Sequence, residues 1–178
     1  MSSEQRRTSG EDEIRAAGVT GRPSLATRHS PLNIEGYASL WGVADLNGDV
    51  VQAGAFADSL ARTGAQGVRM LSQHDARTVV GVWQDITEDE RGLFVRGRIE
   101  DWSAEARFAA ALSRAGVMDG LSIGYRTARA RRQGRLRVLS EVDLWEVSLV
   151  TFPMLPGARF QLPRSLSSRP TRRRSSSV

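Results

Sequence analysis

The alternation of apolar segments with turn residues between positions 32 and 151 constrains the fold more than any other feature of this chain. Segments rich in Val, Leu, Ile and aromatic residues recur along the stretch, which is typical of β-strands. Many strands with few helices predict a β-rich α+β fold, built as a closed or nearly closed β-barrel with flanking helices. The expected strands are 32–43, 68–73, 78–86, 93–99, 121–130 and 136–151.

Two helices are expected beside these strands. The stretch 104–115 begins after Ser103, a favoured N-cap residue, and ends before Gly116, a favoured stop signal. A shorter helix is expected at 55–63, after a turn at 45–49. The apolar side chains of the longer helix recur at helical spacing and predict one apolar face. They are Ala104, Phe108, Ala111, Leu112 and Ala115.

The two ends of the chain differ in composition from its centre. Residues 1–30 are polar and predict a flexible leader, and residues 161–178 are rich in Ser and Arg and predict a disordered tail, which leaves 31–160 as one domain. The net charge of +5 comes from the ends, because residues 159–178 hold Arg but no acidic residue.

No apolar run is long enough for a membrane span, and without cysteine there is no thiolate nucleophile. We therefore expect no contact with a membrane.

Two residues have the chemistry for nucleophilic catalysis. His74 stands at the end of the apolar segment 68–73, where it is either a general base at the rim of the sheet or a histidine that only caps the strand. The other histidine, His29, lies in the polar leader. Ser122 lies in Gly120-Leu121-Ser122-Ile123-Gly124, which matches G-x-S-x-G. An α/β-hydrolase elbow is excluded, because a helix precedes Ser122, a strand follows it, and no histidine lies beyond it.

A carboxylate could complete the catalytic set. Glu146 lies in an otherwise apolar segment, where it either points outward or accepts the ring N–H of His74. Three other acidic residues compete for this role. Asp75 follows His74 directly and would point to the opposite face of a strand, whereas Glu141 and Asp143 share a face that excludes Glu146.

The sequence predicts no cofactor and no metal site. Asp45-x-Asn47-x-Asp49 resembles the start of a calcium loop, but Val50 replaces the glycine and Phe56 takes the place of the closing glutamate. A single well-placed histidine without cysteine also argues against zinc.

Four segments in series resemble the prohead proteases of tailed bacteriophages. The resemblance covers about residues 33–160, in the order found in that family. The opening segment carries Gly36-Tyr37-Ala38 and Gly54-Ala55-Phe56, and the second is 71–75 around His74. The third is 120–125 around Ser122, and the last is 144–153 around Glu146.

The resemblance implies a fold similar to that of the herpesvirus maturation proteases. It also implies that Ser122 is the nucleophile and His74 the general base, with Glu146 where the herpesvirus enzymes have a second histidine. Such a serine endopeptidase would cleave the scaffolding portion of the major capsid protein, and itself, inside the assembling prohead in the host cytoplasm. It would need no cofactor.

Two further interpretations stay open. One is a capsid assembly factor without catalytic activity. The other is a nucleic-acid-binding module that acts through the basic stretch 126–137, and a weak nucleic-acid contact is also expected of the Arg-rich tail.

Overall fold

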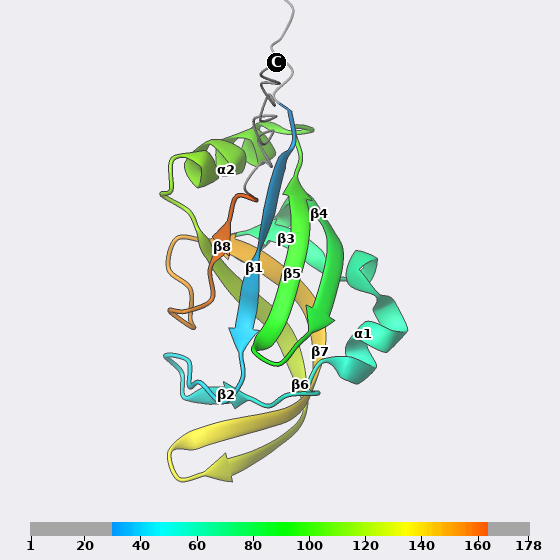
Figure 1. Ribbon diagram of the computed structural model, residues 1–178, viewed down its shortest axis with the longest axis vertical. Coiled ribbons are helices and arrows are strands. Elements are labelled where there is room, and N and C mark those ends of the chain that lie inside the picture. Colours follow the sequence, from blue (N-terminus) through cyan, green and yellow to red (C-terminus); the bar gives the residue numbers. More distant parts are fainter. Residues whose placement is uncertain (1–29, 164–178) are drawn as a thin grey trace, which may run out of the picture.

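Strands make up most of the computed structural model, which describes residues 30–163 (Figure 1). The strands are β1 (Leu32–Leu40), β2 (Asp49–Val51), β3 (Arg69–Ser72), β4 (Asp75–Glu88), β5 (Gly92–Ile99), β6 (Gly120–Gln133), β7 (Leu136–Val150) and β8 (Phe160–Gln161). The helices are α1 (Ala57–Thr63), α2 (Ala104–Arg114) and the 3-10 turn η1 (Ala65–Gly67). The predicted leader up to residue 29 and the predicted tail from residue 164 onward lie outside the described residues.

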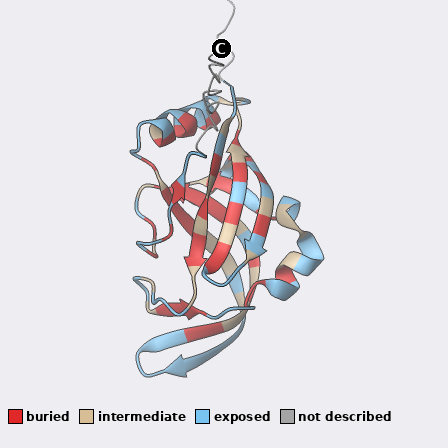
Figure 2. Ribbon diagram, viewed as in Figure 1, coloured by how far each residue is buried: buried red, intermediate tan, exposed pale blue. Residues whose placement is uncertain are grey.

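The strands form one sheet in the order β2-β7-β3-β4-β5-β1-β8, with β6 paired to β7. Strand β7 is central to the site described below, because it pairs antiparallel with β6 and parallel with both β2 and β3. The sheet curls into a half-barrel whose concave side holds the buried residues, and α1 and α2 lie outside it (Figures 1 and 2). The predicted β-rich architecture with flanking helices is confirmed, but a fully closed barrel is wrong.

A short C-terminal segment links the two ends of the curled sheet at one point. The Leu121 N–H donates to the Ala158 carbonyl at 2.9 Å, and the Tyr37 N–H donates to the Arg159 carbonyl at 3.3 Å. Gly36 permits this approach, because a Cβ at that position would lie 2.6 Å from the Phe160 Cα. The prolines near residue 155 suggested that regular structure ends there, so β8 was not expected from the sequence.

Helix α2 packs on the sheet through small side chains. Its N-terminus is capped as predicted, since the Ser103 hydroxyl accepts the Ala106 N–H at 3.0 Å. Four of the five residues of the predicted apolar face are exposed, Phe108 to 64%, whereas Leu112 is partly buried and packs against the core. Small residues let the helix backbone lie close to β4 and β5, which a large side chain at the contact would prevent. The buried residues of the helix are Ala106, Ala109, Ala110 and Ser113.

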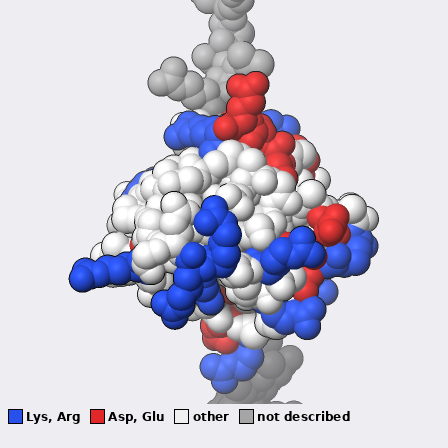
Figure 3. Space-filling model, turned by 90° about the horizontal axis from the view of Figure 1, so that it is seen from below, with Lys and Arg blue, Asp and Glu red and all other residues white. Residues whose placement is uncertain are grey.

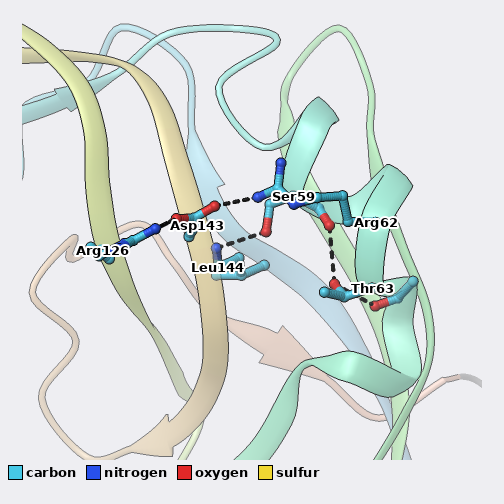
Figure 4. A network of polar contacts seen from close by, with 7 residues as sticks. Ser59, Arg62, Thr63, Arg126, Asp143 and Leu144 are labelled. Carbon is cyan, nitrogen blue, oxygen red and sulfur yellow. Dashed lines mark hydrogen bonds and ion pairs between the residues drawn. The ribbon is translucent and has the colours of Figure 1, made fainter.

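Helix α1 is fastened to the outside of β7 by a polar network (Figure 4). The Ser59 hydroxyl accepts the backbone N–H of Leu144 at 2.9 Å. Asp143 pairs with Arg62 from α1 and with Arg126 from β6, the latter at 2.6 Å. The hydrogen bond from Arg126 lowers the pKa of the Asp143 carboxyl.

Within residues 30–163, no helix is long and apolar enough to cross a bilayer.

Candidate active site

The turn between β3 and β4 places His74 at the rim of the sheet. Ser72 pairs with Asp75, so Gln73 and His74 form a two-residue hairpin loop. Both have positive φ, 53° and 61°, which is the backbone of a type I′ turn. Neither residue is the Asn or Gly that such a turn favours, and each costs on the order of 1–2 kcal/mol in this conformation. Unfavourable backbone of this kind is concentrated at functional sites, which favours a catalytic His74 over a mere strand cap.

Gln73 holds this turn against the end of β7. Its backbone N–H donates to the Leu149 carbonyl at 2.9 Å, and its side-chain amide reaches the Thr151 hydroxyl at 3.4 Å. The turn therefore has a fixed position relative to the strand that carries Glu146.

Glu146 projects from β7 directly beneath this turn. The His74 Nδ1 and the Glu146 Oε1 are 2.6 Å apart, a short contact typical of a charge-assisted hydrogen bond. The other carboxylate oxygen, Oε2, accepts a hydrogen bond from the Ser148 hydroxyl. On the neighbouring strand Glu146 faces Gly124, and a Cβ at that glycine would lie 2.5 Å from the Glu146 Cγ. The glutamate side chain thus lies over the backbone of Gly124.

Ser122 shares its face of the sheet with this group. Across the β6–β7 pair, Ser122 lies opposite Ser148 and Gly124 lies opposite Glu146. Directly opposed residues point to the same side, and so do residues two apart in one strand. Ser122 is only 5% exposed, yet it lines a cavity of about 100 Å³. Its hydroxyl makes no hydrogen bond to His74 within residues 30–163, as is common for catalytic pairs in the absence of substrate.

The predicted turn at 45–49 forms one wall of this cavity. Asp45 Oδ1 accepts the N–H groups of Asn47 at 2.8 Å and of Asp49 at 2.9 Å, so this carboxylate stabilises the turn itself. Asp49 is buried and accepts hydrogen bonds from the Tyr125 hydroxyl at 2.8 Å and from Arg137 Nε at 2.7 Å. The bond from Arg137 lowers the pKa of Asp49, and burial together with Asp49 raises the pKa of Tyr125.

The electrostatics of His74 follow from its partner. The hydrogen bond to Glu146 raises the pKa of the imidazole above its ordinary value of 6.5, and partial burial opposes this. The carboxylate at Nδ1 favours the tautomer with its proton there, which leaves Nε2 free to accept a proton. A base oriented in this way, on the same face as a serine hydroxyl, has the parts of a nucleophilic triad.

The three competing carboxylates contact other groups. Asp75 accepts the Thr78 hydroxyl at 2.9 Å and the Arg77 N–H at 3.0 Å. Glu141 pairs with Arg129, and Asp143 takes part in the network of Figure 4. Of the four candidate acids, the structure brings Glu146 to His74.

Ser148 and Gln73 were not singled out from the sequence, and Gly124 was noted only as the last residue of the G-x-S-x-G match. Ser148 could have been found, because it lies two residues from Glu146 in a predicted strand and so shares its face. The packing of Gly124 under Glu146 and the anchoring by Gln73 depend on the pairing of distant strands. They gave no signal in the sequence.

In this half-barrel His74 contacts Glu146, and Ser122 lies on the same face of β6 and β7, an arrangement compatible with the class of serine hydrolases built on β-sheets. The comparison with known families is more specific: residues 23–172 match the family described as caudovirus prohead serine protease. The chain belongs to this family, and the predicted resemblance is confirmed.

Two prohead proteases of bacteriophages are similar in sequence. That of Enterobacteria phage HK97 is 31% identical over 122 residues, covering 67% of this chain and 54% of the relative. That of Escherichia phage T5 is 29% identical over 144 residues, covering 79% of this chain and 67% of the relative. The chain therefore spans about half of the length of the HK97 protein.

The solved structure of a phage protease supports the fold. The capsid assembly protease of bacteriophage T4 superposes with a TM-score of 0.57 at 18% identity, covering 69% of this chain and 84% of that one. The KSHV protease, solved with a hexapeptide phosphonate inhibitor, has a TM-score of 0.49 at 14% identity and covers 73% of this chain and 64% of that one.

Proposed function

We propose that this chain is a serine endopeptidase of prohead maturation, with Ser122 as nucleophile, His74 as general base and Glu146 as the residue that orients His74. Membership of the prohead protease family supports the reaction class. The observation that carries the residue roles is the 2.6 Å contact between His74 and Glu146, on the face of β6 and β7 that also holds Ser122.

The reaction follows from this arrangement. His74 Nε2 accepts the hydroxyl proton of Ser122 as the oxygen attacks a peptide carbonyl, and Glu146 stabilises the imidazolium that forms. The imidazolium then protonates the leaving amine, so the C–N bond breaks and an acyl-enzyme remains. Water attacks the acyl-enzyme with His74 again as base, which releases the acid product and restores Ser122.

The proposed substrates are the scaffolding portion of the major capsid protein and the protease itself. The names of the relatives support this assignment, as both are prohead proteases. The proposed place of action is the assembling prohead within the host cytoplasm.

Intact-mass analysis of the purified protein tests the proposal, alone and mixed with its capsid protein. Wild type should lose terminal segments or shorten the capsid protein, and Ser122→Ala should do neither. Ser140→Ala, which removes a hydroxyl from the distant part of β7, is the matched control and should behave as wild type. If neither protein shortens itself or the assembled capsid protein, the protein is an assembly factor and not a protease; if both cleave alike, Ser122 is not the nucleophile.

The β6–β7 hairpin favours nucleic-acid contact as a second candidate function. It projects from the end of the molecule opposite α2, and basic side chains gather at that end (Figures 1 and 3). Arg131, Arg132 and Arg135 are exposed near its tip, and none of them forms an ion pair within residues 30–163. Their positive charge is available to an anionic partner.

A salt titration of duplex DNA binding tests this candidate. If the three arginines contact phosphates, replacing them together by Gln should lower the slope of log affinity against log salt by roughly 3. An unchanged slope excludes the hairpin as a nucleic-acid contact. The part assigned to the Arg-rich tail lies outside the described residues and needs its own deletion variant.

A further inference from the structure

We propose that Ser148 is a positioning residue, which holds the Glu146 carboxylate in the orientation that His74 requires. The inference deepens the proposed function and rests on it.

The two oxygens of Glu146 have separate partners. Oε1 contacts His74 Nδ1 at 2.6 Å, and Oε2 accepts the hydrogen bond from the Ser148 hydroxyl. A carboxylate held at both oxygens cannot rotate about its last bond without losing one of the two contacts. The serine therefore determines which way the other oxygen points.

The surroundings of Glu146 explain why such a contact is needed. The side chain lies over Gly124, which has no Cβ to pack against it, and a glutamate has several rotatable bonds. Beside the histidine, the only hydrogen-bond partner of this carboxylate within residues 30–163 is Ser148. A residue that hydrogen-bonds to a catalytic side chain without touching the substrate determines what fraction of the time that side chain is in the productive geometry.

The position of Ser148 is unsuited to the role of a second nucleophile. Ser148 is completely buried, with β6 on one side of its strand and β3 on the other. Its proton is directed to Glu146, whereas Ser122, directly opposite, lines the cavity. The two serines thus share a face, but only Ser122 lines a cavity, and only Ser148 contacts Glu146.

The test compares Ser148→Ala and Ser148→Cys with wild type. Alanine is smaller than serine and cysteine is slightly larger, and both replacements remove the strong hydrogen-bond donor. The first readout is the pKa of His74, measured by NMR, which does not depend on activity. The second is the rate of labelling by a fluorophosphonate probe, in which Ser122 Oγ bonds to phosphorus, its proton passes to His74, and fluoride leaves.

The matched control is Ser113→Ala. Ser113 is also buried, and its hydroxyl donates to the Ala109 carbonyl within α2, away from the site. Its loss should leave both the pKa of His74 and the labelling rate unchanged.

If Ser148 positions the carboxylate, both variants lower the pKa of His74 toward 6.5 and slow labelling roughly tenfold, the usual effect of losing one charge-assisted hydrogen bond. An unchanged pKa overturns the inference. A raised pKa also overturns it. In that case the Ser148 hydroxyl would only reduce the negative charge on the Glu146 carboxylate, whose orientation would be fixed by other contacts. If wild type is not labelled while the pKa falls in both variants, the positioning contact stands and the proposed enzymatic function fails.

Discussion

Replacing Gly124 by alanine should impair catalysis while leaving the fold intact. The backbone of Gly124 does not have the positive φ that only glycine tolerates well, so alanine fits the strand. The obstacle is the Glu146 side chain, because the new Cβ would lie 2.5 Å from its Cγ and 2.7 Å from its Cδ. Atoms in a flexible side chain can swing aside, and here that movement takes the carboxylate away from His74.

The expected magnitudes differ for stability and for rate. Alanine in place of glycine in a strand gains about 0.5–1 kcal/mol from the unfolded state, which offsets part of the lost packing. The free energy of unfolding should therefore change by less than about 1 kcal/mol. The lost hydrogen bond to a charged group is worth about 1.5–3 kcal/mol, and this corresponds to a roughly 10- to 100-fold lower rate.

Fluorophosphonate labelling at pH 8, together with thermal unfolding, measures both quantities. Gly116→Ala is the control: Gly116 has φ +68° with open space around it, so alanine should cost about 1 kcal/mol of stability and leave labelling unchanged. Glu146→Ala supplies the second background, in which Gly124→Ala has no glutamate to displace and should cause no further loss. Full activity of Gly124→Ala, or an equal loss in both backgrounds, would refute the reasoning.

Two further predictions concern ionisable residues. Glu146→Gln should return the pKa of His74 toward 6.5. The acidic limb of the pH–rate profile should then move to lower pH, because the base must be neutral to act, and the rate itself should fall by about 100-fold or more. An acidic limb that stays in place would contradict the role of Glu146. Asp49→Asn should lower the free energy of unfolding at pH 7 by about 1–3 kcal/mol, measured by urea denaturation, because it breaks the contacts to Arg137 and Tyr125. Folding lowers the pKa of Asp49, so its contribution to the free energy of unfolding is complete above its ordinary pKa of 3.8 and is lost as the pH falls through the folded pKa. The difference in stability between variant and wild type should therefore shrink in acid. A difference that does not depend on pH would mean that the carboxylate is not the cause.

Local features of the sequence were sufficient for the elements and for the candidate residues. Alternating apolar positions predicted six of the strands, and Ser103 with Gly116 predicted the ends of α2 closely. The extra strands β2 and β8 are three and two residues long, too short to show a period. They exist because longer strands supply their hydrogen-bond partners.

Periodicity alone misled on one point, the exposed side of α2. Of the predicted apolar face, Phe108 and the three alanines are exposed and only Leu112 packs against the core, whereas the fully buried residues of the helix are Ala106, Ala109, Ala110 and Ser113. The spacing of apolar residues along the sequence does not predict how closely a helix packs against the sheet. How closely it packs decides which face of the helix is buried.

The sequence by itself determined the local structure, the family and two residues with the chemistry of a nucleophile and a base, Ser122 and His74. Only the tertiary structure decided which carboxylate serves His74, because Asp75, Glu141, Asp143 and Glu146 are alike as isolated side chains. The register of β7 against β3 and β6 places Glu146 beneath the β3–β4 turn and over Gly124. A shift of that register by one residue would point Glu146 to the other face of the sheet, so the site depends on pairing between strands that lie far apart in the chain.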